Sequence, residues 1–508
     1  MNHPIKLKYS PQTPDKAQVD KLSNLIIVLA DTPASKTWHS FPYGDILQQR
    51  VRRGHKKELS TTPLVTELPN NISTQVTLAT VKPDISPFEL LTLARKLSQA
   101  HFARQPSAIA LCMPDLEPAF AARVAEALVA ALLAGAYPLP HFKSKKDAPK
   151  RLGTLSIFGL KDKPDFRRSF AEAEGNNLAR HLTALPPNEL TPTQYRARIA
   201  ALAKEHGWRM DFLDIAKLKR KQAGAFLAVC QGSPVADAGI VHLRYQPKGR
   251  GAKPAVALVG KGICYDTGGT NLKPPKNMYG MHEDMEGSAV ALGTLLALSR
   301  LQVDFPVECW LALAQNHIGP HAYKQNDVVT ASNGVTIEIM HTDAEGRMVL
   351  ADTLALASIQ KPALIIDYAT LTGSCVAALG TRYSGAFTNR NEFIPVIMTA
   401  GQASGERVWP FPNDADYDAD LDSEIADIKQ CSLESGPDHI QAARFLTRFV
   451  DKAIPWIHID LSSGNHKGGL AHIPTDITAV GVRFTLNLLL DQQVLQHPAR
   501  KPAPTPCP

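Results

Sequence analysis

The sequence has few cysteines, and they show no pattern. Seven are scattered over 508 residues, and none forms a C-x-x-C pair. A disulfide framework or a cysteine-based zinc site is therefore not expected, and a reducing compartment fits best. The short apolar run 25–30 follows mixed charges and is too brief for a secretory signal. We expect a cytoplasmic protein.

The sequence also lacks a strong charge excess and a long apolar run. Lys and Arg number 55 against 48 Asp and Glu, so the net charge is only +7. Nucleic-acid binders usually concentrate basic charge more strongly, and we interpret the densest basic runs, 50–57 and 143–151, as solvated loops. No segment is expected to supply the roughly 18 to 20 apolar residues that span a bilayer. A membrane partner is therefore not expected.

Length and composition predict two folded α/β domains. Hydrophobic residues make up 44% and charged residues 20%, as in soluble globular proteins, and 508 residues exceed one ordinary core. The N-terminal third alternates expected strands with amphipathic helices, at 25–30, 76–81, 87–103, 117–133 and 155–160. This predicts a smaller N-terminal α/β domain at 1–165, with an oligomerisation or regulatory role, followed by a connecting helix at 167–185.

Residues 166–496 are predicted to form the larger C-terminal α/β domain. Strands are expected at 255–259, 307–314, 335–340, 363–367 and 456–461, with a helix at 287–301. Such alternation predicts a central, mostly parallel sheet, with ligands beyond the carboxyl ends of its strands. The Pro-rich end, 497–508, is predicted to be a disordered tail.

Lys261 and Asp266 stand in the segment G-K-G-I-C-Y-D-T-G-G, directly after an apolar strand. The P-loop pattern G-x-x-x-x-G-K-[ST] and the dinucleotide pattern G-x-G-x-x-G both fail here, so phosphate binding is not expected. The D-T-G at 266–268 also resembles an aspartic protease motif. Those enzymes use two such carboxylates, whereas this chain has one copy in an α/β setting. An aspartic protease is therefore not expected.

Three more carboxylates follow expected strands, namely Asp284, Asp343 and Glu345. Alone, each is more often a helix cap or first-turn residue than a ligand. Together with Asp266 they would repel one another unless cations compensate them, and two divalent cations cancel four negative charges. Oxygen ligands suit Mg and Mn, and Zn also accepts them. Lys261 could join only as a neutral amine, which burial and metal charge favour.

Histidines offer a different metal site. His317 and His321 are four residues apart, and His466 and His472 form a second pair. No H-E-x-x-H motif is present, because the H-E at 282–283 lacks its second histidine. We interpret these histidines as polar loop or interface residues.

With these residues in place, the sequence resembles the leucyl aminopeptidase family of dinuclear metallopeptidases, also called cytosol aminopeptidases. The most specific pieces are V-G-K-G-x-x-x-D-T-G-G and T-D-A-E-G-R at this separation. Further matches are N-N-L-A-R at 176–180, P-P-N-E-L-T-P at 186–192, A-T-L-T-G at 369–373 and G-V-R at 481–483. The resemblance covers essentially the whole length.

The resemblance implies a role for each motif residue. Two divalent ions per subunit are implied, Mn or Zn first and Mg or Co as alternatives, with Asp266 and Glu345 bridging them. Lys261 and Asp284 would complete one site and Asp343 the other. The resemblance also implies that Lys273 stabilises the tetrahedral intermediate and that Arg347 binds a bicarbonate that acts as general base. The pocket for the substrate's N-terminal residue would be lined by Met281, Thr370 and Gly373.

This sequence departs from the family pattern at several positions. Glu286 replaces a small residue, Glu283 a residue that is commonly basic, and His341 the usual Asn. The stretch 462–467, S-S-G-N-H-K, replaces an apolar, small-residue segment that forms one wall of the side-chain pocket. A more polar pocket gains less from burying Leu, which predicts a weaker preference for Leu than the family name suggests.

The resemblance implies a metal-dependent aminopeptidase that removes the N-terminal residue from peptides with a free N-terminus. It also implies a homohexamer and a cytoplasmic location. One alternative stays open, a catalytically weak or silent paralogue with a structural role or with DNA binding through the run 50–57.

Overall fold

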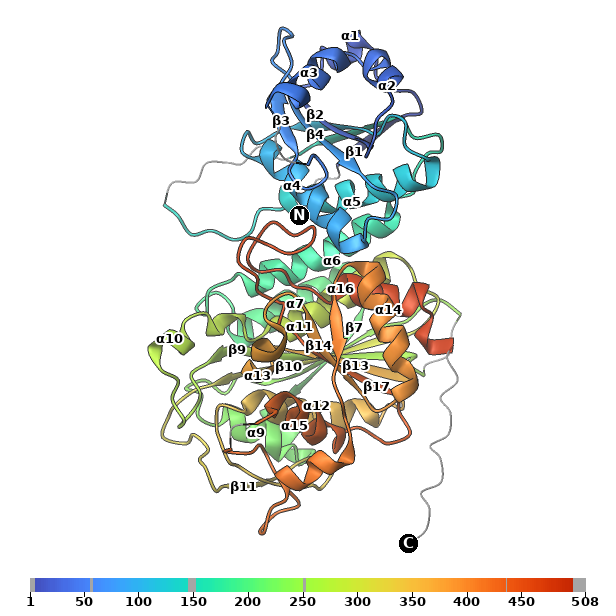
Figure 1. Ribbon diagram of the computed structural model, residues 1–508. Coiled ribbons are helices and arrows are strands. Elements are labelled where there is room, and N and C mark those ends of the chain that lie inside the picture. The colour runs from blue at the N-terminus through green and yellow to red at the C-terminus, as the bar shows by residue number, and fades with distance from the viewer. Residues whose placement is uncertain (1–4, 55–57, 145–151, 250–252, 435, 497–508) are drawn as a thin grey trace. The chain divides into compact units, whose positions relative to one another are not determined.

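The computed structural model describes residues 5–54, 58–144, 152–249, 253–434 and 436–496. The chain divides into two compact units, shown in Figure 1. The first comprises Met1–Ala173 and Lys467–Asp476, and the second Glu174–His466 and Ile477–Pro508. The division falls within helix α6 (Arg167–Thr183) rather than at residue 165. The predicted tail 497–508 and part of each basic run, 55–57 and 145–151, lie outside the described residues.

The first unit is built on a six-stranded sheet in the order β1-β6-β5-β2-β4-β3, parallel except for β3 against β4. Its strands are β1 Lys6–Ser10, β2 Asn24–Ala30, β3 Leu64–Glu67, β4 Gln75–Val81, β5 Ala108–Cys112 and β6 Thr154–Phe158. Its helices are α1 Lys16–Val19, α2 Ser35–Ser40, α3 Gly44–Gly54, α4 Pro87–Phe102 and α5 Pro118–Ala136. Side chains of β2 alternate between two cores, with Ile26 and Val28 in one and Leu25 and Ile27 in the other.

Helix α5 corrects one expectation from the sequence. It is long and apolar enough to cross a membrane, although no such segment was expected. Its apolar side chains instead pack in the core of the first unit with those of α4, among them Leu128, Leu132 and, from α4, Leu93. A helix that is apolar on most faces is typical of a position inside a protein as well as inside a bilayer.

The segment Lys467–Asp476 joins the first unit although it comes late in the chain. Ala471 is buried in the same core as α4 and α5. The guanidinium of Arg95, on α4, donates from Nε to the carbonyl oxygen of Ala471 at 2.9 Å. Sequence order placed this segment in the C-terminal domain, whereas the structure shows that it belongs to the first unit.

The second unit is built on an eight-stranded sheet in the order β15-β14-β17-β13-β9-β10-β8-β7. The four central strands, β17, β13, β9 and β10, are mutually parallel, as predicted. The outer pairs β14 with β17, β10 with β8 and β8 with β7 are antiparallel. The strands are β7 Arg209–Asp214, β8 Gly239–Tyr245, β9 Val256–Asp266, β10 Val307–Asn316, β13 Leu364–Ala369, β14 Ser384–Thr388, β15 Val408–Pro410 and β17 Trp456–Asp460.

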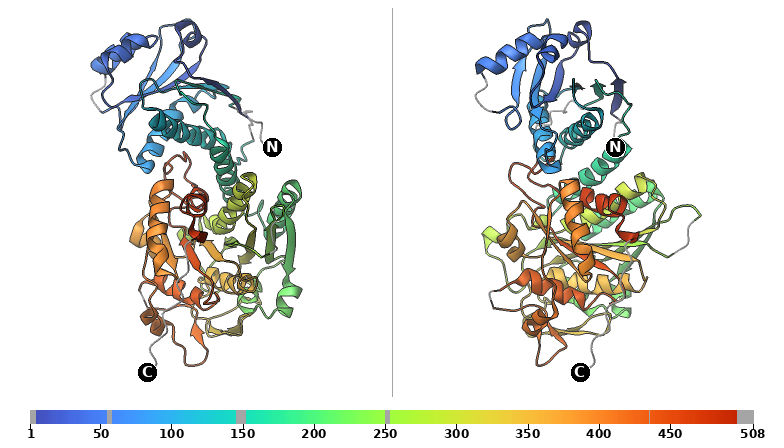
Figure 2. Two further views of the ribbon diagram at one scale, coloured as in Figure 1. Left: turned by 90° about the vertical axis from the view of Figure 1, so that its right-hand side faces the viewer. Right: turned by 45° about the vertical axis from the view of Figure 1, so that its right-hand side comes forward.

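Helices lie on both faces of this sheet (Figure 2). Helices α11 and α12 are the most deeply buried and pack directly on β9 and β10. The helices are α7 Pro192–His206, α8 Ile215–Arg220, α9 Gly224–Cys230, α10 Pro275–Met278, α11 Glu286–Arg300, α12 Glu345–Ser358, α13 Gly373–Leu379, α14 Ile394–Ser404, α15 Asp438–Thr447 and α16 Val482–Leu486. Short turns of 3-10 or π type are η1 Met281–Glu283, η2 Asn391–Phe393, η3 Ala415–Leu421, η4 Asn487–Asp491 and η5 Val494–Gln496.

Two predicted strands of this unit need correction. The strand expected at 255–259 continues as β9 to Asp266, so Lys261 lies within a strand and not in a loop. The strand expected at 335–340 is β12 (Thr336–Glu338), and it belongs to a separate small sheet with β11 (Val328–Thr330) and β16 (Ile428–Lys429). Glycines at 260 and 262 made β9 look shorter than it is, because glycine weakens a strand unless a neighbour approaches closely.

A buried polar network joins two central strands. Asp367 on β13 pairs in register with His458 on β17, and both are completely buried. His458 Nδ1 lies 2.6 Å from one Asp367 carboxylate oxygen, and Trp456 Nε1 donates to the other at 2.6 Å. Both oxygens of a buried carboxylate are thus satisfied, which such a group requires in the middle of a sheet.

Replacing Asp367 tests the contribution of this network. We expect Asp367→Ala to lower the free energy of unfolding by about 3–5 kcal/mol, because it leaves the imidazole and indole without their buried partner. Asp367→Asn, which keeps an acceptor for Trp456, should lose less. Chemical denaturation followed by tryptophan fluorescence measures both. Equal stability of Asp367→Ala and the native protein would contradict this role.

The same pair gives stability a pH dependence. Burial lowers the pKa of His458, but the charge and hydrogen bond of Asp367 outweigh it, so the pKa is raised overall. The stabilisation is therefore fully present below the unfolded-state pKa of about 6.5 and is lost as pH rises through the raised folded-state pKa. The stability advantage of the native protein over Asp367→Asn should shrink with rising pH in parallel denaturation curves. An advantage that grows with pH would rule the pair out.

Candidate metal centre

Strand β9 brings Lys261 into the interior between the sheet and α12. A Cβ atom on Gly260 would lie 2.4 Å from the Cα of Ser288, so the glycine lets α11 approach the strand. A Cβ on Gly346 would lie 2.6 Å from Lys261 Cε, so the second glycine makes room for the lysine side chain. These glycines therefore position the 3% exposed Lys261.

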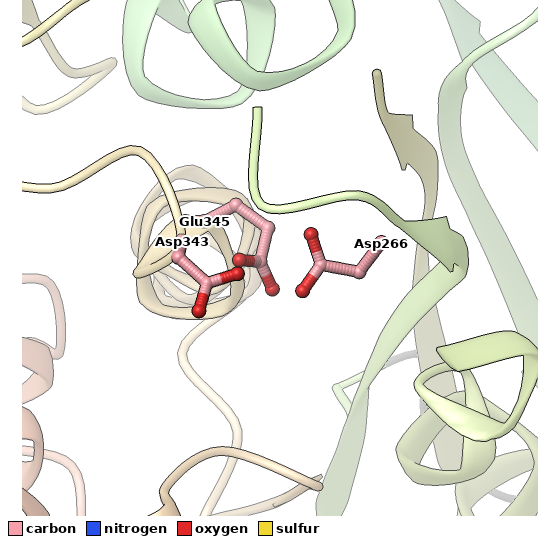
Figure 3. Close-up of side chains that lie close together, drawn as sticks. All are labelled: Asp266, Asp343 and Glu345. Atoms are coloured by element: carbon pink, nitrogen blue, oxygen red, sulfur yellow. The ribbon is translucent and has the colours of Figure 1, made fainter. Parts of the chain in front are cut away.

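Three carboxylates lie close together (Figure 3), and one of them, Glu345, contacts Lys261. Asp266 ends β9, Glu345 begins α12, and Asp343 lies in the turn before α12. One oxygen of each lies within 4.8 Å of the others, and among the described residues this is the only cluster of three or more candidate ligands. The histidine pairs form no such cluster within that part of the chain.

Hydrogen bonds fix the orientation of Asp266. Its Oδ1 accepts from the backbone N–H of Gly268 and from Asn316 Nδ2, both at 2.8 Å. The second oxygen, Oδ2, is left facing Lys273, whose Nζ lies 3.0 Å away. Asn316 ends β10, the strand next to β9. The two strand ends thus hold the carboxylate in one orientation, which the sequence did not reveal.

Two lysines share the four predicted carboxylates. Lys261 Nζ lies 2.6 Å from Asp284 Oδ1 and 3.0 Å from Glu345 Oε1. Lys273 Nζ lies 2.5 Å from Asp343 Oδ1 as well as 3.0 Å from Asp266 Oδ2. The side chains alone therefore carry four negative and two positive charges in one buried place, a net excess of negative charge.

The pKa values reflect this crowding. Burial, followed by repulsion from neighbouring carboxylates, raises the pKa of Asp284 to about 8, of Glu345 to about 7 and of Asp343 to about 6, although the lysines oppose the shift. Burial disfavours the Lys261 ammonium, but the charges of Asp284 and Glu345 outweigh it and raise its pKa. A divalent cation here would favour the carboxylates over their protons and oppose the charge on Lys261.

The donor atoms suit a hard divalent cation. Asp284 Oδ2 and Glu345 Oε2 are buried and have no hydrogen-bond partner among the described residues. Buried carboxylate oxygens normally have partners. Carboxylates together with one amine match the ligands that Mn, Mg and Zn accept.

Arg347 lies one turn into α12 and is 2% exposed. Its Nη2 donates to Asp438 Oδ1 at 2.7 Å, and its Nη1 donates to the carbonyl oxygen of Gln430 at 3.2 Å. The guanidinium is thus held at the edge of the metal centre with an anionic partner. The sequence analysis did not identify Asp438, which follows a glycine- and proline-containing loop and carries no motif.

All ten predicted site residues line one cavity of about 690 Å³ in the second unit. Met281, Thr370 and Gly373 lie on its wall together with Lys273, Arg347 and the five residues predicted to bind metal. Asp460, at the end of β17, also reaches the cavity and was missed. It accepts hydrogen bonds from the Leu371 backbone at 3.1 Å and from Thr372 Oγ1 at 2.6 Å, so it shapes the loop that carries Thr370. Its position at a strand end was the available signal.

The residues that depart from the family pattern lie in this cavity. His341, Glu283 and Glu286 line it, as do Ser462 and Asn465 from the 462–467 stretch. The Ser462 hydroxyl, however, donates to the carbonyl of Tyr383 at 2.7 Å, so its polarity is satisfied within the protein. Burial and then the charge of Glu283 raise the pKa of Glu286 to about 8, a shift that a nearby cation would oppose.

Comparison with known proteins gives consistent matches. The family model described as "Cytosol aminopeptidase family, catalytic domain" matches residues 177–486. A probable cytosol aminopeptidase of Stutzerimonas stutzeri (strain A1501) is 42% identical over 357 residues, covering 67% of this chain and 70% of the relative. Another, of Parasynechococcus marenigrum (strain WH8102), is 36% identical over 479 residues, covering 92% and 96%.

Solved structures agree in fold. A mutant tomato leucine aminopeptidase superposes with a TM-score of 0.83 at 26% identity, covering 96% of this chain and 97% of its own. The bottromycin maturation enzyme BotP in complex with Mn gives a TM-score of 0.80 at 28% identity, covering 93% and 100%.

Metal addition tests the charge analysis. We expect Mn²⁺ to raise the thermal midpoint of metal-stripped protein, since a ligand at a hundredfold excess over its Kd stabilises the folded state by about 2.7 kcal/mol. Glu345→Gln should reduce this shift, whereas Glu392→Gln, at an exposed carboxylate on η2, should retain it. Scanning calorimetry with and without Mn²⁺ measures the difference. An equal shift in the two variants would argue against Glu345 as a ligand.

Proposed function

The chain belongs to the cytosol aminopeptidase family, and from that premise we propose that the cavity of the second unit is the active site. The protein is a metal-dependent aminopeptidase of the leucyl type, a hydrolase that removes N-terminal residues from peptides. One observation carries the assignment of the site: all the motif residues for this chemistry, distant in sequence, line a single cavity.

The proposed ligands divide between two divalent ions. Lys261, Asp266, Asp284 and Glu345 would hold one ion, and Asp266, Asp343 and Glu345 the other. The 4.8 Å cluster of Asp266, Asp343 and Glu345 supports the second site, and the contacts of Lys261 with Asp284 and Glu345 support the first. Mn is the first candidate, because the similar enzyme BotP is described in complex with Mn, and Zn is the second.

Bound divalent ions would lower the pKa of a shared water and polarise the scissile carbonyl. The protein's own contribution is orientation. Asn316 and the Gly268 N–H hold Asp266 at one angle, and Thr370 Oγ1 donates to Asp284 Oδ1 at 2.8 Å. These contacts keep the carboxylates in place, so that little reorganisation accompanies the reaction.

Lys273 is proposed to stabilise the tetrahedral intermediate. Its ammonium is favoured because, although burial opposes it, the charge of Asp266 and its neighbours raises its pKa overall. A positive charge that is held in a mostly buried cavity interacts strongly with a developing oxyanion. It contacts Asp266 and Asp343, which places its Nζ directly beside the proposed ligands.

Arg347 is proposed to bind a bicarbonate that serves as the general base. A guanidinium suits this anion because its paired N–H groups match two oxygens. Asp438 now accepts from Nη2, so an added anion would compete with that carboxylate or share the remaining donors.

The substrate would be a peptide with a free N-terminus, and its first side chain would lie against Met281, Thr370 and Gly373, which share the cavity. We further propose a location in the cytoplasm, in keeping with the names of the relatives. A homohexamer is proposed from the sequence resemblance alone. The DNA-binding alternative has no support among the described residues, and part of the run 50–57 lies outside them.

Two classes of variant should separate metal binding from catalysis. Asp266→Ala should abolish turnover and reduce bound metal, because Asp266 is proposed to serve both ions. Lys273→Ala should keep the metal but lower kcat by about 10²–10³-fold, as expected when one donor to an oxyanion is removed. Kinetics with Leu-amide, combined with metal analysis by mass spectrometry, distinguishes them. Two bound metals and near-normal kcat in Asp266→Ala would refute the ligand assignment.

A further inference from the structure

One corner of the cavity is acidic without any lysine to balance it. Glu283 ends η1, Glu286 begins α11, and Asn465 follows β17 in the chain; all three line the cavity together with Met281. We refer to Glu283, Glu286 and Asn465 as the acidic corner. Neither glutamate has an ion-pair partner in the part of the chain that the structure describes, whereas the four carboxylates proposed as metal ligands each contact a lysine.

Glu286 is held in the interior with one free oxygen. The residue is 1% exposed, and its Oε1 has no hydrogen-bond partner among the described residues. The backbone N–H of Ala479 supplies one hydrogen bond to the carboxylate. A Cβ atom on Gly464 would lie 2.5 Å from Glu286 Oε2, so glycine at 464 is what allows the carboxylate to occupy this place. The site therefore accommodates a buried carboxylate with unused acceptor capacity.

Glu283 is fixed in the same corner by a side-chain contact. Asn465 Nδ2 donates to Glu283 Oε2 at 2.8 Å, and the Asn465 backbone bridges to Ile477. Glu283 thus presents a second carboxylate in a set orientation. Gly464 lies against the Glu286 carboxylate and the next residue, Asn465, contacts Glu283, so two consecutive residues hold both carboxylates in this corner.

An unpaired carboxylate in the interior is unfavourable unless a cation or donor reaches it. The acidic corner and Met281 line the same cavity, and Met281 begins the short turn η1 that Glu283 ends. Met281 is also the proposed contact for the substrate's first side chain. A side chain with an apolar stem and a cationic end fits this combination, because the stem can pack on Met281 while the end meets the carboxylates. Lysine and arginine have this form.

A third metal ion fits the corner less well. Glu283 and Glu286 form no cluster of three close ligands with any other described His, Cys, Asp or Glu. Metal sites in proteins need several convergent oxygens. An ammonium or guanidinium needs only acceptors at its donor atoms.

We propose that Glu286, with Glu283 and Asn465, makes this enzyme selective for peptides whose N-terminal residue is cationic. The inference rests on the proposed active site and narrows its substrate class. The expectation of a weak preference for Leu remains, but its cause becomes charge in the acidic corner and not the serines at 462 and 463, both of which are already paired.

The test compares two dipeptide substrates that differ only in charge. Lysine and norleucine at the N-terminus share an unbranched stem, and only lysine carries an ammonium. We expect kcat/KM for the lysyl substrate to exceed that for the norleucyl substrate by about ten- to a hundredfold, the range for a hydrogen bond to a charged group. As competitive inhibitors, free L-lysine should have a lower Ki than free L-norleucine. This comparison measures binding separately from turnover.

Variants then assign the effect to Glu286. Glu286→Gln keeps the shape but removes the charge, so the lysine-to-norleucine ratio should fall toward one for kcat/KM and rise toward one for Ki. Glu283→Gln should lower it less, and the exposed Glu392→Gln should leave the ratio unchanged. A native ratio at or below one, or an unchanged ratio in Glu286→Gln, would overturn the proposal. The proposal would also be overturned if the native chain bound three Mn²⁺ ions and Glu286→Gln lost one of them, because the acidic corner would then be a metal site.

Failure of the proposed function has a different signature. If the native enzyme with Mn²⁺ hydrolyses neither substrate nor Leu-amide, the active-site assignment itself fails. If it hydrolyses norleucyl and leucyl substrates well but shows no gain for lysine, the site stands and only the selectivity proposal is wrong.

Discussion

The structure of the second unit depends on compensating a buried excess of negative charge. Four carboxylates and two lysines meet where β9 ends and α12 begins, and neither set is acceptable in the interior without the other. Several local features follow from this requirement. Glycine at 260 lets α11 approach the strand, glycine at 346 admits the Lys261 stem, and Asn316 turns Asp266 toward Lys273. The two lysines balance only half of the four negative charges, and the remainder is the physical reason for a metal centre.

The sequence motifs group residues that the fold brings into one cavity, whereas several details of the fold around them were not predicted. Spaced motifs identified Lys261, Asp266, Asp284, Asp343 and Glu345, and these residues line one cavity. Helix and strand periodicity also located the parallel centre of the large sheet. Strand β9 was predicted too short, because close approach by α11, and not a turn, explains Gly260. The sheet membership of β12, the partners Asn316 and Asp438, and the burial of α5 depend on contacts between distant segments, for which no local pattern exists.

The acidic corner also depends on a contact between distant residues that the sequence does not show. Glu286 was recognisable as an unusual residue in the motif around Asp284, but Gly464 carried no signal by itself. Only the structure shows that the two positions are coupled, since any side chain at 464 would meet the Glu286 carboxylate. The serines at 462 and 463 looked like the source of polarity in the pocket, yet their hydroxyls bond to Tyr383 and Ser384. Pocket polarity therefore has to be judged by which groups remain unpaired, and not by residue type.

The segment Lys467–Asp476 belongs to the first unit although it is synthesised late, and this has a consequence for biosynthesis. Ala471 fills part of the core under α4 and α5 and accepts from Arg95, so the N-terminal unit is not continuous in the chain. During translation, Arg95 leaves the ribosome several hundred residues before Ala471 does. Because synthesis proceeds at about 5–20 residues per second, the nascent unit waits tens of seconds with part of its core uncovered. A truncated transcript or a stalled ribosome would release this unit without its last segment, and such a fragment would expose apolar surface to chaperones and proteases.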